Sequence, residues 1–535
     1  MSIKTIKRLV LVLLTVVAIA QVGLSLVESW GQPQIQSRLQ LYQTNLILHA
    51  AELQDDKPPN GSGADIANAR TALLGQNPFE TAQKQYQDAR EEAQTNLKTI
   101  QAKLAPSVAP ASTDTSDSQS QYPPVSEASA QQPQRQQSAS QVGKLLAELD
   151  VRIGILQAQQ GKTTEAINTW TQFIEQAETQ ESETALTKTA AVLIGLWSEP
   201  SRLLPDAESQ IQQNLDSWFR YRALTKLYKL QQRQEALSAL QAQEQEVAEK
   251  AAVKLAIVGG IPAIGGVLGV GTLVFLAAQL LLQGKQSLLS NNSELTWTTP
   301  WDWETIWQVL IFGFFFIGQI LLPLIFGLVF NSLGSNPATF GVRMKAIYVM
   351  LSYLLLAGGG LLVLYISVKP YFPLPEGWFR FQWRGGWILW GVGGYFAALP
   401  LVVLVSLINQ QIWKGQGGSN PILPLALEGR DSVALSIFFL TASVAAPAFE
   451  EIIFRGFLLP SLTRYMPIWG AIVASSFLFA IAHLSLSEVL PLATLGMILA
   501  VVYTRSRNLF APMLLHSLWN AGTLLSLYAL GSGVN

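Results

Sequence analysis

Long apolar runs dominate the chain after residue 255 and restrict what it can fold into. A helix needs about 20 apolar residues to cross a bilayer. Eight runs of that length or close to it occur near residues 255–282, 306–330, 345–368, 386–408, 432–456, 467–486, 488–503 and 510–530. A ninth run, residues 9–27, lies near the N-terminus. Together they predict an all-α, polytopic membrane protein with nine spans.

The N-terminal run follows Lys4, Lys7 and Arg8, as both signal peptides and signal anchors do. No convincing Ala-x-Ala site follows it, so residues 1–28 are interpreted as an uncleaved anchor. The basic residues predict a cytoplasmic N-terminus, which would put residues 29–250 outside the cytoplasm. A bacterial plasma membrane and a thylakoid-type membrane both fit.

Residues 29–250 are polar, unlike the rest of the chain. Residues 29–104 and 143–250 carry apolar residues at helical spacing, which predicts extracytoplasmic helical segments. Residues 105–142 are rich in Pro, Ser and Gln and are interpreted as a disordered linker. His49 is interpreted as a partly exposed helix residue without a functional role.

Residues 143–250 contain two similar helical stretches, in which Ala166 and Ala236 are 70 positions apart. This is about twice the 34-residue tetratricopeptide period. A short tetratricopeptide-like array and a plain helical bundle are both open, and either would offer a surface to protein partners. The net charge of −1 implies no nucleic-acid partner. The absence of cysteine excludes disulfides, thiolate nucleophiles and cysteine-based zinc sites.

Two adjacent carboxylates, Glu450 and Glu451, interrupt an apolar run, and Arg455 follows. A charge near the bilayer centre costs at least ~2.5–3.5 kcal/mol, so such residues face a protein interior. Glu451 and Arg455 are four residues apart and can pair on one helix face. Glu450 lies about 100° away and can face a separate cavity. A purely structural role is the alternative for Glu451 and Arg455.

Two further polar sites lie downstream in apolar runs. Phe479 and His483 are four residues apart, so the ring can wall one side of the imidazole. His516 and Asn520 are also four apart. The order Glu-Glu-x-x-x-Arg, Phe-x-x-x-His, His-x-x-x-Asn resembles the CPBP (CAAX protease and bacteriocin-processing) family of intramembrane proteases, also called the abortive-infection family. The resemblance implies an eight-helix protease-like core, with residues 431–535 as its catalytic part and residues 251–430 as accessory transmembrane helices.

Peptide hydrolysis needs a base to activate water and donors to hold the developing oxyanion. We expect Glu450 to be the base and His483 to orient the same water. His516 and Asn520 would donate to the oxyanion, while Arg455 would balance Glu451. The resemblance implies the same roles.

Zinc bound by Glu450, His483 and His516 is the competing mechanism. His-Glu-x-x-His is absent, and a metal-free, cofactor-free reaction is favoured. The expected substrate is a membrane protein or a lipidated peptide, and prenylated tails are one family class. A non-catalytic membrane scaffold on a protease-like fold is the second reading. A transporter with a proton-relay carboxylate is the third.

Overall fold

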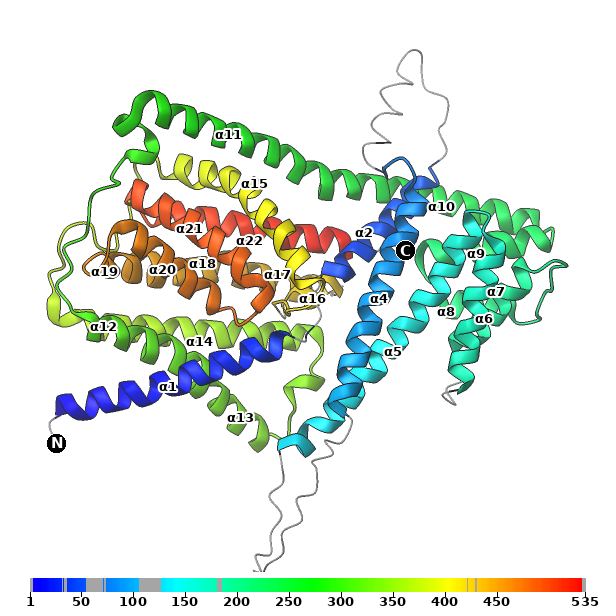
Figure 1. Cartoon of the computed structure of the whole chain (residues 1–535), viewed down its shortest axis with the longest axis horizontal. Coiled ribbons are helices and arrows are strands. Elements are labelled where there is room, and N and C mark those ends of the chain that lie inside the picture. Colours follow the sequence, from blue (N-terminus) through cyan, green and yellow to red (C-terminus); the bar gives the residue numbers. More distant parts are fainter. Residues whose placement is uncertain are drawn as a thin grey trace, which may run out of the picture. The chain divides into compact units, whose positions relative to one another are not determined.

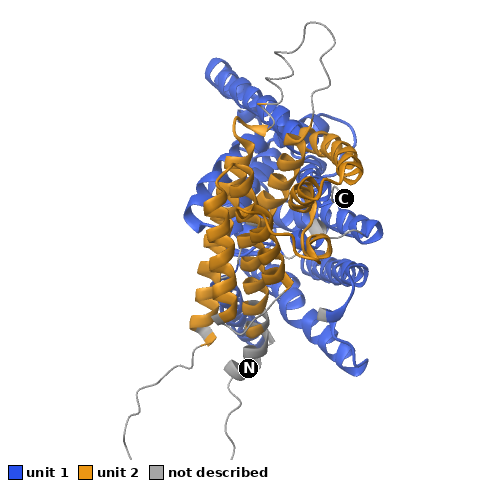
Figure 2. Ribbon diagram, turned by 90° about the vertical axis from the view of Figure 1, so that its right-hand side faces the viewer, with its two compact units in different colours: residues 1–35, 257–533 blue, residues 36–256, 534–535 orange. Residues whose placement is uncertain are grey.

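The computed structural model describes residues 3–30, 32, 36–53, 71, 74–104, 127–179, 185–420, 422–428 and 431–531. The regular elements of these residues are helices, and no β-strand occurs among them (Figure 1). The predicted all-α polytopic architecture is confirmed. The chain divides into two compact units, residues 1–35 with 257–533 and residues 36–256 with 534–535 (Figure 2).

The first unit, here called the membrane unit, contains the apolar helices. It begins with α1 (Ile3–Trp30) and continues with α11 (Ile261–Gln283), α12 (Trp303–Gln308), η4 (Val309–Leu321), α13 (Leu322–Ser332), α14 (Val342–Val368), α15 (Trp387–Trp413) and α16 (Ile422–Glu428). Its C-terminal part consists of α17 (Ser432–Leu440), η7 (Thr441–Ala445), α18 (Ala446–Glu451), η8 (Ile452–Leu458), α19 (Leu459–Leu462), α20 (Ile468–Ile481), η9 (Leu486–Glu488), α21 (Val489–Ser506) and α22 (Phe510–Gly531). In the described part of the chain after residue 255, the apolar elements other than the short α16 join into eight helical rods, as the family resemblance implied.

Seven helical stretches in the described residues are long and apolar enough to cross a membrane, and they make the chain an integral, multi-pass membrane protein. They are Thr5–Trp30, Gln234–Gln286, Trp303–Ser332, Val342–Tyr371, Trp387–Trp413, Ser432–Leu462 and Leu486–Ser506. The sequence predicted nine. The helix α20 has only 14 residues, about 21 Å at 1.5 Å per residue and short of a ~30 Å hydrocarbon core. The helix α22 is long enough, but polar residues around His516 and Asn520 reduce its hydropathy.

Small residues let the helices of the membrane unit approach closely. A Cβ on Gly269 of α11 would lie 2.2 Å from the Phe396 carbonyl oxygen of α15. A Cβ on Gly391 of α15 would lie 3.0 Å from the Ala511 carbonyl oxygen of α22. Such contacts suit helices in lipid, where close van der Waals packing drives association. They fix α15 between α11 and the helices that carry the candidate site (Figure 1).

The N-terminal helix α1 makes polar contacts along its length. Near its start, the Arg8 Nε donates to Glu304 Oε2 over 2.9 Å. In its middle, Gln21 Nε2 donates to a backbone carbonyl of η4 over 3.0 Å. Near its end, Ser29 Oγ accepts from the first backbone N–H of η9 over 3.1 Å. The predicted anchor helix is therefore packed as a part of the membrane unit.

The second unit, here called the soluble unit, is a set of helices around an aromatic-rich core. Its helices are α2 (Gln36–Ala51), α4 (Pro78–Leu104), α5 (Glu127–Gln159), α6 (Thr163–Thr179), α7 (Ala185–Trp197), α8 (Ala207–Asn214), α9 (Ser217–Leu230) and α10 (Gln234–Leu255). The tetratricopeptide-like assignment stays a prediction.

Two details of the soluble unit differ from the sequence predictions. Residues 127–142 of the predicted linker form the first half of α5, where Ala, Gln and Arg are good helix formers. Residues 105–126 lie outside the described residues. His49 is only 3% exposed, so its interpretation as a partly exposed residue was wrong. Its hydrogen-bond partners come from distant helices that local spacing does not reveal.

Candidate active site

The two carboxylates lie on one long helical rod. It runs without a break from Ser432 to Leu462 through α17, η7, α18, η8 and α19. Two of its segments, η7 and η8, are π-helical, and such segments occur frequently at functional sites. Glu450 and Glu451 end α18, directly before η8.

Glu451 forms the centre of a buried ionic network. The Arg455 Nη1 donates to Glu451 Oε1 over 2.9 Å, and its Nη2 donates to the Gly496 carbonyl of α21 over 3.1 Å. The His516 Nδ1 of α22 lies 2.8 Å from the same Glu451 oxygen. Glu451 and Arg455 are 0% exposed and His516 is 3% exposed. Glu451 thus connects its own rod to α22, and Arg455 connects the same rod to α21.

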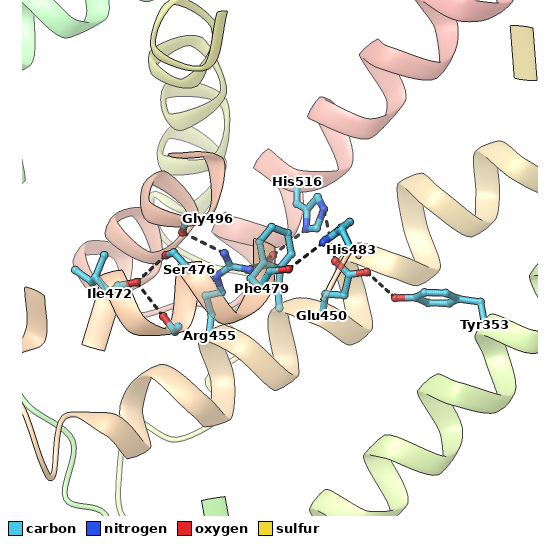
Figure 3. A network of polar contacts seen from close by, with 11 residues as sticks. Tyr353, Glu450, Arg455, Ile472, Ser476, Phe479, His483, Gly496 and His516 are labelled. Carbon is cyan, nitrogen blue, oxygen red and sulfur yellow. Dashed lines mark hydrogen bonds and ion pairs between the residues drawn. The ribbon is translucent and has the colours of Figure 1, made fainter. Parts of the chain in front are cut away.

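Glu450 has a different environment from its neighbour. Its side chain is 14% exposed. The Tyr353 hydroxyl of α14 donates to Glu450 Oε1 over 2.9 Å (Figure 3). The His516 Nε2 lies 3.9 Å from Glu450 Oε2. Because Glu451 holds the Nδ1 side of this imidazole, its Nε2 side is directed at Glu450.

The sequence analysis missed Tyr353. It is a single tyrosine in an apolar run, 97 residues from Glu450. No spacing rule connects the two positions, so the sequence carried no signal for this contact.

His483 lies two residues after Ile481, the last residue of α20. Its Nδ1 donates to the Phe479 carbonyl over 2.9 Å, which leaves Nε2 for another partner. The Phe479 ring makes edge-on contacts with both imidazoles. The distance between ring centroids is 5.0 Å to His483 and 5.7 Å to His516. The Arg455 guanidinium lies over the same ring, 4.5 Å from its centroid. Figure 3 shows Glu450, His483 and His516 grouped on one side of this ring.

Asn520 occupies the next turn of α22 after His516. Its Nδ2 donates to the Ala442 carbonyl of η7 over 2.7 Å. One amide N–H expected to hold an oxyanion therefore connects α22 to the glutamate-bearing rod. An amide nitrogen carries two N–H donors, so the second N–H remains for a substrate.

The side chains of the zinc alternative are not arranged as a ligand set. No group of three or more His, Cys, Asp and Glu residues within the described ranges is placed to hold a metal ion. His516 uses Nδ1 toward Glu451 and His483 uses Nδ1 toward the Phe479 carbonyl. Both Nε2 atoms stay available, as they do in metal-binding histidines, so these two contacts do not distinguish the mechanisms.

Comparison with known proteins identifies the family. The family model described as type II CAAX prenyl endopeptidase Rce1-like matches residues 432–522. The C-terminal region belongs to the CPBP family. The matched range includes every site residue predicted from the sequence, and it excludes Tyr353. Membership in the CPBP family supports a membrane protease activity at the level of the family.

Two curated bacterial proteins are similar to this region. YdiL of Bacillus subtilis, whose name describes a membrane peptidase, is 29% identical over 133 residues, which are 25% of this chain and 53% of YdiL. The membrane-embedded CAAX protease MroQ of Staphylococcus aureus is 27% identical over 139 residues, which are 25% of this chain and 55% of MroQ. The chain thus spans about half the length of the curated relatives it matches. No solved structure matches the chain.

Proposed function

We propose that the chain is an intramembrane endopeptidase that hydrolyses a peptide bond of a membrane-associated substrate with water activated by Glu450. The observation that carries the proposal is the contrast between two neighbouring carboxylates. Glu451 is 0% exposed and paired with Arg455. Glu450 is partly exposed, positioned by Tyr353, and adjacent to His516.

In the proposed reaction, Glu450 takes a proton from water as the hydroxide attacks the scissile carbonyl carbon. The free Nε2 of His483 orients this water. The second Asn520 amide N–H donates to the oxyanion as it forms. The His516 Nε2 donates as well when the imidazole carries a proton on both ring nitrogens, because its Nδ1–H is already donated to Glu451. Glu450 then returns the proton to the leaving amine, so the carboxylate is regenerated when the C–N bond breaks.

The Glu451–Arg455 pair has a supporting role in this proposal. It holds His516 from the Nδ1 side and fixes the ring orientation, as carboxylates do for catalytic histidines. Phe479 separates this buried pair from His483 and limits the directions that both imidazoles can take.

We propose that the reaction requires no metal or other cofactor. The test is cleavage of a library of membrane peptides in liposomes by the native chain and by Glu450→Gln, each with and without a chelator. Cleavage that survives chelation and is lost in Glu450→Gln supports the proposal. Cleavage that chelator abolishes and zinc restores would move the assignment to a metalloprotease. A folded native chain that cleaves nothing would favour the scaffold reading.

The proposed substrate is a membrane protein or a lipidated peptide, and the soluble unit would recruit protein partners. The proposed topology has a cytoplasmic N-terminus and an extracytoplasmic soluble unit, in a bacterial plasma membrane or a thylakoid-type membrane. Because the chain has no cysteine, a single Gln172→Cys substitution in α6 gives a clean probe. Labelling of sealed, right-side-out vesicles by an impermeant maleimide is expected, and labelling only after permeabilisation would contradict this topology.

A further inference from the structure

A second group of chemistry-bearing side chains lies in the soluble unit. His49 of α2, Ser217 of α9 and Glu244 of α10 form a continuous hydrogen-bonded chain. We propose that these three residues form a second hydrolytic site, which cleaves small carboxylic esters through a covalent acyl-Ser217 intermediate. The proposal does not rest on the function of the membrane unit.

The order and distances match those of a serine nucleophile activated by a histidine and a carboxylate. The His49 Nδ1 lies 2.5 Å from Glu244 Oε1, and its Nε2 lies 2.8 Å from Ser217 Oγ. With the ring proton on Nδ1 donated to Glu244, the Nε2 lone pair accepts the Ser217 hydroxyl proton. Such an arrangement makes histidine the base and keeps it in the required tautomer.

The three groups differ in how deeply they are buried, and the difference fits their proposed roles. His49 is 3% exposed and Glu244 is 4% exposed, so water competes little for their hydrogen bond. Ser217 is partly exposed at the start of α9, unlike the two buried groups. Trp218 Nε1 donates to Glu52 Oε1 over 2.8 Å, and this bond holds the end of α2 against the start of α9. The imidazole is thereby kept opposite the serine.

The backbone at Ser217 supports a role beyond packing. Its φ is +53°, a left-handed conformation that is uncommon for serine, and strained backbone clusters at functional sites. The N-cap residue Asp216 makes no side-chain capping bond to α9 and instead pairs with Arg152. The Arg220 N–H donates to the Asp216 carbonyl over 3.2 Å. The N–H groups before it in the first turn receive no cap from the Asp216 side chain and would donate to an oxyanion beside the Ser217 hydroxyl.

The chemistry balances without another reagent. His49 takes the Ser217 proton as Oγ bonds to the ester carbonyl carbon, and the proton passes to the leaving alkoxide as the C–O bond breaks. Water then attacks the acyl-Ser217 ester with His49 as base, releasing the carboxylic acid and restoring the serine. A small ester fits because Ser217 is only partly exposed and because an alkoxide leaves more readily than an amine.

The experiment uses the full chain in liposomes with two probes, a fluorophosphonate that traps activated serines and p-nitrophenyl butyrate. The native chain should form a fluorophosphonate adduct that peptide mass spectrometry locates at Ser217. Ser217→Ala should remove the adduct, and His49→Gln should slow its formation at least tenfold. Ester hydrolysis should fall in parallel.

Two control variants isolate the site. Ser209→Ala removes an exposed serine of α8 in the same unit and should leave labelling unchanged. Glu304→Gln changes the membrane unit outside its candidate site and should also leave ester hydrolysis unchanged. Absence of a Ser217 adduct in native chain with an intact unfolding transition overturns the proposal. Ester hydrolysis that persists in folded Ser217→Ala also overturns the proposal.

Discussion

Arg455 offers a quantitative test of the buried network that holds the candidate site. Its guanidinium and the Glu451 carboxylate are both 0% exposed and lie 2.9 Å apart. Arg455→Met removes the cation and keeps most of the side-chain volume. The Glu451 Oε2, which has no partner, would remain buried, and Oε1 would retain only His516.

The expected loss follows from the cost of an uncompensated buried charge. Removing one partner of a buried ion pair costs about 3–5 kcal/mol. The contact with the Phe479 ring adds about 0.5–2 kcal/mol. We therefore expect Arg455→Met to lower the free energy of unfolding by at least ~3 kcal/mol. Adding Glu451→Gln should recover most of this loss, because the remaining neutral amide still accepts from His516.

The assay is chemical unfolding in mixed micelles, followed by tryptophan fluorescence. Arg343→Met is the matched control, because Arg343 pairs with Asp431 over 2.9 Å while its side chain is 57% exposed. Exposed pairs contribute about 0–1 kcal/mol. If Arg455→Met and Arg343→Met cost the same, or if the double variant is less stable than Arg455→Met, the ionic role assigned to Arg455 is refuted.

Three further predictions concern single contacts. Tyr353→Phe removes a hydrogen bond to a carboxylate, worth about 1.5–3 kcal/mol, and should lower kcat/KM roughly 10–100-fold. An equal loss of kcat/KM in Tyr348→Phe, which lacks this bond, would contradict the role given to Tyr353. Asn520→Ala removes a part-buried hydrogen bond between α22 and η7 and should lower the free energy of unfolding by about 0.5–1.5 kcal/mol, with a loss of cleavage. Unchanged unfolding would show that this bond does not stabilise the fold. Gly269→Ala forces α11 away from α15 and should lower the free energy of unfolding by about 1–3 kcal/mol. The control Gly271→Ala, with nothing within 4 Å of its Cβ, should leave this free energy unchanged. Equal unfolding free energies for the two variants would contradict the close packing of α11 on α15.

Helical periodicity predicted the parts of the site that depend on one helix. Residues four apart share a helix face, and this rule anticipated the Glu451–Arg455 pair and the contact of Phe479 with His483. The order of the motifs also predicted the family, which the family model confirms.

Contacts between distant segments could not be predicted from the sequence. His516 and Glu451 are 65 residues apart, and Tyr353 and Glu450 are 97 residues apart. Both bonds depend on how whole helices pack. His49 was misread for the same reason, because its partners lie 168 and 195 residues further along the chain.

The number of membrane-spanning helices also could not be predicted correctly from the sequence. The run at residues 467–486 continues past the end of α20 into the turn that carries His483. Hydropathy does not show where a helix ends, and the positive φ of +57° at Leu484 marks the change of direction. A candidate site histidine, His483, is thus hidden next to a helix end inside an apparent span.

The most direct test of the central claim compares cleavage rates of one membrane peptide by the native chain, Glu450→Gln and Glu304→Gln in the same liposomes. Glu304 pairs with Arg8 in the membrane unit but lies outside the candidate site. Loss of a general base lowers a rate by about 10²–10⁴-fold. We expect a loss of this size in Glu450→Gln alone. Cleavage by folded Glu450→Gln at the native rate would contradict it.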